Sequence, residues 1–392
     1  MNILFIVDNI VRANLGGVER VTLLLAQELR KRGHETAILS LKAPDTIPEK
    51  DHEIPEYFIK YNSSSYKEDL NKLLKELKID KIILQGVYNQ ILGTLNSLPS
   101  DDDLAIFLVH HNKPFHFHGY EKKIMRLTPW RDLNYRQKIL KTIAVLLPQL
   151  HRKIITQRTG NTYRFIIDRV DRFVLLSERF KKKVVNLLPE IESAKVVAIN
   201  NPNTFVSRPF NDTIVKENIV VYVGRLDNPQ KNLFDFIRVW KEFYKANEDW
   251  KAFVIGDGEH KETIKKFAEK QKAKNLIFLG NKKDVEEYYR KAKIICLTSN
   301  YEGWGMVLTE AQAYGCVPVV FDTYESVYDI IQSEENGIVV NAFDIMRMAG
   351  EMSLIARDEN LFEKLSENGR ESIKRFEIDK IADQWEEMLN SI

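Results

Sequence analysis

The sequence lacks the features of several protein classes. It has only two cysteines in 392 residues, so neither a disulfide framework nor a cysteine metal site is expected, and two core cysteines suggest a reducing cytosol. No apolar run approaches the length of a membrane span, since the longest, from Ile143 to Leu150, is interrupted by Pro148. The first residues lead directly into an apolar strand and do not resemble a signal peptide. We therefore expect a cytoplasmic protein, at most peripheral on the inner face of the cell membrane.

The chain also lacks a strong overall charge. A net charge of +2 argues against a nucleic-acid-binding protein. The charge is uneven, however, because residues 121–170 hold twelve Lys/Arg and only three Asp/Glu. Aromatic and aliphatic residues alternate with these cations at helical spacing between about residues 119 and 167. This segment predicts either a basic helix pair on an anionic membrane surface or a helical hairpin packed on its domain with solvated cations.

Short apolar runs alternate with amphipathic helices in both halves of the chain. This pattern predicts an α/β protein with two Rossmann-like, doubly wound domains, since 392 residues are too many for one ordinary core. The turn residues 200–203 are typical of a linker. We expect an N-terminal domain over residues 1–200, which includes the basic helical segment, and a second domain over residues 201–376.

The most informative stretch covers residues 298–320. A buried strand is followed by Glu302, the pair Gly303 and Gly305, a helix that begins near Met306, and Glu310. A strand, glycine turn and helix leave backbone N–H groups free to bind an anion. Glu302 lies at the carboxyl end of a strand, where α/β proteins bind ligands, whereas Glu310 is also explained by the helix dipole. The stretch predicts a site for phosphates and hydroxyls.

Three other segments follow predicted strands. Gly224 and Arg225, with Lys231 six residues later, suit a diphosphate, although a solvated basic loop is the simpler alternative. Gly16 and Gly17 open a helix, either as a close backbone approach to a ligand or as a tight turn. The pair His110–His111 could donate a hydrogen bond or act as a base, although a strand-end histidine is more often structural. The carboxylates Glu302 and Glu310 could also form a glycosidase pair, but hydroxyl recognition fits better beside phosphate-binding segments.

Together these motifs resemble the retaining glycosyltransferases of family 4. The resemblance rests on Glu302 and Glu310 with seven residues between them, and on four further motifs in the family's order. These motifs are Gly16-Gly17-Val18-Glu19, Gly224-Arg225-Leu226 with Lys231-Asn232, Gly256-Asp257-Gly258 and Tyr314-Gly315-Cys316-Val317-Pro318-Val319. The similarity extends over nearly the whole chain and is densest over residues 219–340. It implies a GT-B fold, in which the two domains face each other across a cleft and a final helix, residues 377–392, returns to the first domain.

The resemblance also implies roles for individual residues. Arg225 and Lys231, with the Gly17 backbone N–H, would hold the diphosphate of a nucleotide sugar, and Gly16 and Gly224 would shape the adjoining loops. Glu310 would bind the ribose, Glu302 the sugar hydroxyls, and Asn281 would lie beside the base. The backbone around Gly303, Trp304, Gly305 and Met306 would line the donor. Either His110 or His111 would face the transferred sugar. The candidate catalytic residues are therefore His110, His111, Glu302, Arg225 and Lys231.

The implied reaction is sugar transfer with retention from a nucleotide-diphosphate sugar to a glycan or lipid-linked glycan, in bacterial surface polysaccharide synthesis. A UDP-sugar is favoured over a GDP-sugar, and electrostatic stabilisation of the leaving diphosphate would be the main catalytic effect. This account needs no metal or other cofactor. The alternatives are a GT-B epimerase or phosphorylase, or a nucleotide-sugar-binding protein without catalysis. One departure from the family is that residues 321–331 lack the Gly-Gly pair that many members carry there.

Overall fold

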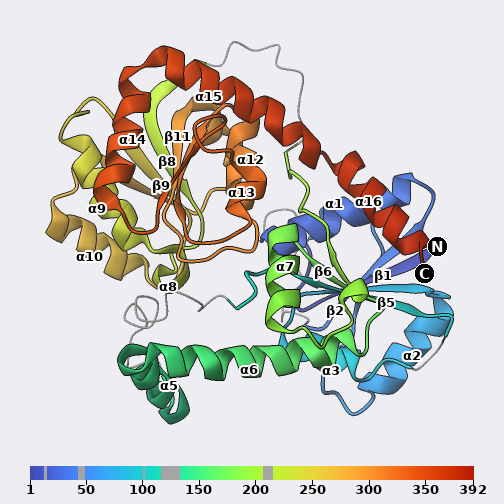
Figure 1. The fold of residues 1–392 in the computed structure, drawn as a ribbon. Helices are drawn as coiled ribbons and strands as arrows, with labels where there is room; N and C mark the ends of the chain where they lie inside the picture. The colour runs from blue at the N-terminus through green and yellow to red at the C-terminus, as the bar shows by residue number, and fades with distance from the viewer. Residues whose placement is uncertain (13–15, 43–48, 100–101, 116–132, 206–214) are drawn as a thin grey trace. The chain divides into compact units, whose positions relative to one another are not determined.

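The computed structural model describes residues 1–392 except 13–15, 43–48, 100–101, 116–132 and 206–214. The chain forms two compact units (Figure 1). The first unit comprises residues 1–114, 158–204 and 376–392, and the second comprises residues 115–157 and 205–375. Each unit contains one sheet of parallel strands, so the predicted α/β fold is confirmed. Of the described part of the basic segment, residues 133–157 fall in the second unit and residues 158–167 in the first.

The sheet of the first unit has the strand order β3-β2-β1-β4-β5-β6-β7. Its strands are β1 (Asn2–Val7), β2 (Glu35–Ser40), β3 (Glu56–Phe58), β4 (Lys81–Gln85), β5 (Ala105–His110), β6 (Arg172–Leu175) and β7 (Val196–Ala198). Its helices are α1 (Gly17–Lys31), α2 (Tyr66–Glu76), α3 (Asn89–Leu95), α7 (Glu178–Leu187), α16 (Ile378–Asn390) and the second part of α6 (Pro148–Ile167). The order of the strands reverses between β1 and β4, and ligands of such sheets bind outside the carboxyl ends of the strands at this point.

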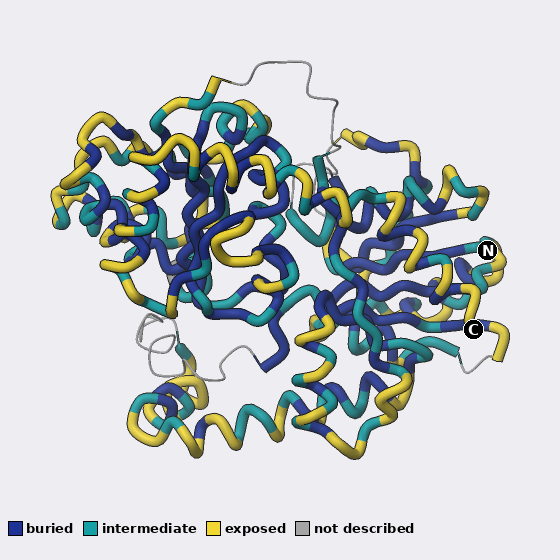
Figure 2. Tube along the Cα trace, turned by 45° about the horizontal axis from the view of Figure 1, so that its top comes forward, coloured by how far each residue is buried: buried dark blue, intermediate teal, exposed yellow. Residues whose placement is uncertain are grey.

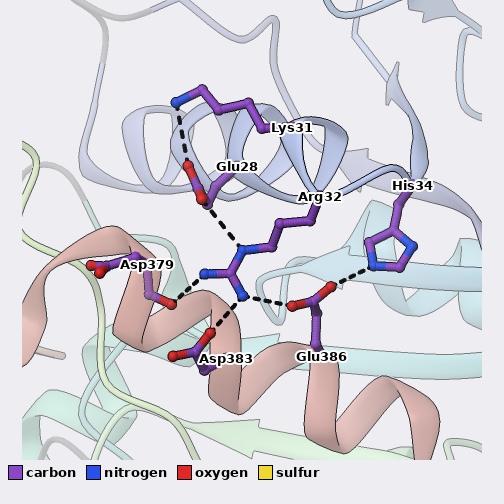
Figure 3. Close-up of polar contacts among 7 residues, drawn as sticks. All are labelled: Glu28, Lys31, Arg32, His34, Asp379, Asp383 and Glu386. Carbon is purple, nitrogen blue, oxygen red and sulfur yellow. Dashed lines mark hydrogen bonds and ion pairs between the residues drawn. The ribbon is translucent and has the colours of Figure 1, made fainter.

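The C-terminal helix α16 belongs to the first unit and packs on α1. Arg32, at the end of α1, donates to Asp383 Oδ1 and Glu386 Oε2, each at 2.6 Å, and to the Asp379 carbonyl at 2.7 Å (Figure 3). His34 Nε2 contacts the other oxygen of Glu386 at 2.7 Å. The hydrogen bond from Arg32 holds the pKa of Glu386 below its usual value. This polar cluster, beside the buried face of α16, joins the two ends of the chain.

The sheet of the second unit has the strand order β10-β9-β8-β11-β12-β13. Its strands are β8 (Glu217–Val223), β9 (Lys251–Ile255), β10 (Leu276–Gly280), β11 (Ala292–Leu297), β12 (Val317–Asp322) and β13 (Ile338–Asn341). Its helices are α8 (Asn228–Lys231), α9 (Leu233–Tyr244), α10 (Lys261–Gln271), α11 (Glu286–Lys291), α12 (Met306–Ala313), α13 (Val327–Ile330), α14 (Ile345–Arg357) and α15 (Glu359–Ser372). Every residue of β11 is buried, including the apolar run of residues 294–297. Figure 2 shows buried segments inside each unit and exposed ones at the surface. The reversal of strand order in this sheet, called the strand reversal below, lies between β8 and β11.

Two helices account for the described part of the basic segment. α5 (Tyr135–Leu146) begins at Asn134, whose side chain forms a capping box with Gln137, and α6 begins at Pro148. Pro148 thus interrupts the apolar run and starts the next helix, because proline is favoured at the first helical position. Residues 116–132, the rest of the predicted segment, lie outside the described residues. Of the helices that the structure describes, none is both long enough and apolar enough to cross a bilayer.

Candidate functional site

The centre of the candidate site is an ion pair at the strand reversal of the second unit. Lys231 follows β8 and Glu302 follows β11, and Lys231 Nζ lies 2.6 Å from Glu302 Oε1. Both side chains are nearly buried, with exposed fractions of 13% and 8%. Ser299 Oγ donates to the same carboxylate oxygen at 2.6 Å. The cation and the carboxylate that the sequence assigned to different parts of a ligand are therefore direct neighbours.

Backbone hydrogen bonds join the two loops that carry this pair. Asn300 N donates to the Gln230 carbonyl at 2.7 Å, and Asn300 Nδ2 donates to the Pro229 carbonyl at 2.8 Å. Thr298 Oγ1 donates to the Asn232 carbonyl at 3.1 Å. Because these contacts use the main chain of both loops, the positions of Lys231 and Glu302 are set by the fold as well as by their mutual attraction.

Arg225 extends the positive charge of the site toward solvent. It is exposed and lies directly after β8 and Gly224, and its Nη2 donates to Gln230 Oε1 at 2.9 Å. Gln230 belongs to α8, which ends at Lys231. An exposed guanidinium and a nearly buried ammonium at one strand end can bind two parts of a diphosphate, the first by a bidentate contact and the second as a point charge.

The N-terminus of α12 adjoins this pair in sequence. Gly305 precedes the helix with φ of +93°, a left-handed conformation that favours glycine, and Met306 is the first helical residue. The first N–H groups of such a helix have no partner within the helix and can bind an anion. Trp304 is buried, with 2% exposure. Among Gly303 to Met306, the backbone is therefore the better candidate to line a ligand than the indole.

Glu310 lies in the second turn of α12. Its Oε2 accepts a hydrogen bond of 3.1 Å from the Tyr289 hydroxyl, and both residues are buried. The Tyr289 ring stacks on Tyr314 and meets Phe205 edge-on. A carboxylate at this depth is held by a specific partner, so its position does not depend on the helix dipole alone.

Glycines bring the strand-end loops of the second unit together. Gly224 N donates to the Ile255 carbonyl, and Gly256 N donates to the Gly280 carbonyl, at 3.0 and 2.9 Å. A Cβ on Gly256, whose φ is +139°, would lie 2.0 Å from the Gly224 oxygen, so only glycine fits there. Asn281, directly after Gly280, is exposed. The Gly256-Asp257-Gly258 motif thus packs the loop that carries Arg225.

The two N-terminal glycines of the motif lie at the start of α1 in the first unit. Gly16 is the N-cap, in extended conformation, and Gly17 is the first helical residue. A Cβ on Gly16 would lie 2.3 Å from Oε2 of Glu19, which is the end of a flexible side chain. The backbone conformation therefore does not require glycine at residue 16, and its small size leaves the helix N-terminus open.

The two strand-end histidines have different surroundings in the first unit. His110 is buried, stacks on Phe173, and its Nε2 lies 2.8 Å from the hydroxyl of Tyr163 on α6. His111 Nε2 hydrogen-bonds Oε1 of the buried Gln85, at the end of β4. Desolvation lowers the pKa of His111 to about 4, so this imidazole is neutral at pH 7.

A small recess lies at the carboxyl edge of the sheet in the first unit, beside His111. It is lined by polar residues from strand ends and by apolar residues of α1 and α16, among them Gln85, His111, Asn200, Asn201, Val21 and Trp385. Of the two histidines, only His111 is among the described residues that line this recess. The recess holds about 10 Å³, roughly the space of one water molecule.

One trio of described residues could supply metal ligands. Asp227, Glu259 and His260 have their ligand atoms within 4.8 Å of one another. Glu259 is largely exposed, and His260 Nδ1 is 3.4 Å from its carboxylate. The trio adjoins the Arg225 loop in sequence, yet exposed carboxylates of this kind often bind no ion, and no second feature of the described residues indicates a ligand there.

Several residues of this site carry no sequence motif. Ser299, Tyr289, Gln85 and Tyr163 each hold a candidate residue through a side-chain hydrogen bond. Only Ser299 lies within the stretch that the motifs single out. The others come from distant segments, and no local pattern marks a tyrosine or glutamine that will hydrogen-bond a residue 21, 26 or 53 positions away.

The chain is similar to known glycosyltransferases. The family model of group 1 glycosyl transferases matches residues 205–372, and that of glycosyltransferase family 4 matches residues 15–202. An uncharacterized glycosyltransferase of Haemophilus influenzae is 26% identical over 98% of this chain and 99% of its own length. A Campylobacter jejuni α-1,4-N-acetyl-D-galactosaminyltransferase, which acts on an undecaprenol diphosphate-linked glycan, is 30% identical over 55% of this chain and 56% of its own length.

Solved structures share the fold. A Staphylococcus aureus TarM variant in complex with fondaparinux, α-GlcNAc-glycerol and UDP superposes with a TM-score of 0.75, over 100% of both chains, at 14% sequence identity. This likeness shows the GT-B architecture. From the two family models, which together cover most of its length, and from this fold, the chain belongs to glycosyltransferase family 4, the group 1 glycosyltransferases.

Proposed function

We propose that this glycosyltransferase transfers a sugar, with retention, from a UDP-sugar to a glycan or lipid-linked glycan of a bacterial surface polysaccharide. The observation that carries the proposal is the Lys231–Glu302 pair at the strand reversal of the second unit, with exposed Arg225 on the adjoining loop. It combines cations suited to a diphosphate with a carboxylate suited to sugar hydroxyls.

The names of similar proteins support the finer parts of this proposal. The TarM variant has UDP bound, and the C. jejuni relative extends a glycan carried on undecaprenol diphosphate. A relative from Erwinia amylovora, 31% identical over 46% of this chain and 51% of its own length, takes part in amylovoran biosynthesis. A UDP-sugar donor and a lipid-linked acceptor are therefore our working choice for this chain.

In the proposed reaction the leaving group is the nucleoside diphosphate. As the bond from the anomeric carbon to the diphosphate oxygen breaks, negative charge grows on that oxygen. Arg225, Lys231 and the N-terminus of α12 would stabilise this charge, because they are positioned before the reaction and need little reorganisation. The leaving oxygen would take the proton of the acceptor hydroxyl. The acceptor oxygen would then bond to the anomeric carbon on the same face of the sugar.

The remaining residues would position the donor. Glu302 keeps one carboxylate oxygen for Lys231 and Ser299, and its second oxygen would accept from sugar hydroxyls. Glu310, held by Tyr289, would accept from the ribose. Of the two histidines, we propose His111 for the transferred sugar, because it lines a recess and is neutral, so that its ring can accept or donate a hydrogen bond.

Replacement of Arg225 tests the diphosphate assignment. Arg225→Ala is expected to reduce transfer about 100- to 1,000-fold, because a cation that stabilises the leaving group is lost. Affinity for UDP, measured by calorimetry, should also fall. Arg347→Ala is the matched control, since the Arg347 side chain is 65% exposed on α14 and forms an ion pair with Glu351 of the same helix. Unchanged UDP affinity in Arg225→Ala would remove Arg225 from the diphosphate site.

We also propose that the helices α5 and α6 contact an anionic membrane surface. Residues 133–167 contain no Asp or Glu; Lys141 is buried, and the other cations are Arg136, Lys138, Arg152, Lys153, Arg158 and Arg164. Large apolar side chains are exposed around the junction of the helices: Leu146 by 69%, Leu147 by 56% and Leu150 by 45%. Anionic headgroups would attract these cations, and the apolar side chains would enter the interface.

Vesicle binding tests the membrane proposal. The protein should sediment with phosphatidylglycerol vesicles, less with phosphatidylcholine vesicles, and less at high salt, because surface charges are then screened. Leu146→Ser combined with Leu147→Ser should weaken binding about tenfold or more, since two exposed apolar side chains no longer insert. Met346→Ser, at a residue 66% exposed on α14, is the control. If the wild-type protein stays in the supernatant with anionic vesicles, the membrane proposal is wrong.

A further inference from the structure

The segment that lacks the family's glycines is fixed against the Glu302 loop. Residues 323–326 lie between β12 and α13. Thr323 Oγ1 donates to the Ser299 carbonyl at 2.6 Å, and Ser326 Oγ donates to the Gly303 carbonyl at 3.0 Å. Thr323 and Ser326 are fully buried or nearly so. These two hydrogen bonds hold the two residues between them, Tyr324 and Glu325, in a defined position beside the loop that carries Glu302.

The Tyr324 hydroxyl is buried in this position without a partner. The residue is 2% exposed, and no group among the described residues hydrogen-bonds its hydroxyl. A buried hydroxyl without a partner lowers stability, so proteins rarely keep one that has no use.

The hydroxyl lies at the N-terminus of α12. A Cβ on Gly305 would be 3.1 Å from the Tyr324 oxygen, so the hydroxyl lies against the backbone that leads into this helix. Burial first, and then the negative charge of Glu302, raise the pKa of Tyr324 well above its ordinary value. The group therefore remains protonated and can donate a hydrogen bond near the Glu302 carboxylate.

We propose that the Tyr324 hydroxyl donates a hydrogen bond to an oxygen of the donor's sugar and helps to select that sugar. The inference rests on the proposed function, because it takes the ligand beside Glu302 to be a nucleotide sugar. The sugar is a better partner than the diphosphate, since Tyr324 adjoins Glu302 and Gly305, whereas Arg225 is exposed on the loop after β8. Residues 321–331 lack the Gly-Gly pair of many family members, so the contact depends on a side chain that this chain carries in that segment.

The variant Tyr324→Phe removes the hydroxyl alone. Wild type and variant are compared by calorimetry with UDP, UDP-glucose, UDP-galactose, UDP-N-acetylglucosamine and UDP-N-acetylgalactosamine. For the sugar that wild type prefers, affinity and kcat/KM should fall about 10- to 100-fold, while UDP affinity stays unchanged. The melting temperature without ligand should stay equal or rise, because a buried unpaired group is lost. Tyr328→Phe, at a residue 39% exposed, is the control.

Each contrary result has a separate meaning. Equal affinity of wild type and Tyr324→Phe for the preferred UDP-sugar would overturn this inference and leave the proposed function unaffected. An equal loss of affinity for UDP would assign the hydroxyl to the diphosphate and overturn the sugar contact. A lower melting temperature without ligand would show that the hydroxyl has a structural partner. If wild type binds UDP but none of the four UDP-sugars, the proposed donor is wrong, and the inference that rests on it is overturned with it.

Discussion

Lys231→Met is expected to reduce kcat/KM about 1,000-fold or more, because one substitution removes a cation of the diphosphate site and the partner of Glu302. Lys231 Nζ lies 2.6 Å from Glu302 Oε1, and both side chains are nearly buried. Without Lys231, Ser299 is the one hydrogen-bond partner left to that carboxylate oxygen among the described residues. The free energy of unfolding should therefore also fall, by about 3 kcal/mol.

A double-mutant cycle separates the two effects of Lys231. Combining Lys231→Met with Glu302→Gln removes the unpaired buried charge, so most of the lost stability should return, whereas activity should remain low. Lys245→Met, at a cation 62% exposed, should change neither quantity measurably. If the losses of stability in the two single variants simply add in the double variant, Lys231 and Glu302 do not interact in solution. Guanidinium unfolding and initial transfer rates are the measurements.

Glu56→Leu should lower the stability of the first unit by about 3–5 kcal/mol, because it leaves Arg12 buried without its carboxylate. Arg12 Nη1 lies 2.9 Å from Glu56 Oε2, and the exposed fractions of the two side chains are 3% and 5%. Arg12 Nε also donates to the Glu49 carbonyl at 3.1 Å. Glu56 is on β3, the edge strand of the sheet, so the pair ties this strand to the loop after β1.

Thermal unfolding followed by circular dichroism measures this effect. A loss of this size corresponds to a fall in melting temperature of roughly 6–15 °C for a unit of this length. Arg12→Met combined with Glu56→Leu should recover much of the loss, because an apolar pair of similar volume avoids the unpaired charge. Lys31→Ala, which breaks a pair with Glu28 at a cation 74% exposed, is the control. A change below about 1 kcal/mol in Glu56→Leu would show that water reaches Arg12.

Much of the fold was predictable because its signals are local. Apolar runs such as residues 3–7 and 294–297 predict buried parallel strands, and both form strands in the structure. Helix boundaries followed glycine and proline, as at Gly17 and Pro148. The short strand β3 and helix α3 were not predicted, because three or seven residues carry too little periodicity to be recognised.

The sequence indicated the residues of the candidate site but not the contacts between them. Spacing and strand ends indicated Arg225, Lys231, Glu302 and Glu310, since motifs that follow buried strands are visible in one dimension. The structure added that Lys231 and Glu302, 71 residues apart, form one ion pair. It also showed that the Tyr289 hydroxyl donates a hydrogen bond to Glu310, a contact that no spacing rule predicts.

The sequence by itself determined most strands and helices and the family, and it indicated which polar residues to consider for the site. Only the tertiary structure decided which of these residues are partners, because burial and hydrogen bonding depend on which distant segments pack together. Tyr324 is the clearest case: in the sequence it is one aromatic residue of a segment that lacks the Gly-Gly pair of many family members. Packing against the Glu302 loop buries its hydroxyl and leaves that hydroxyl without a partner among the described residues.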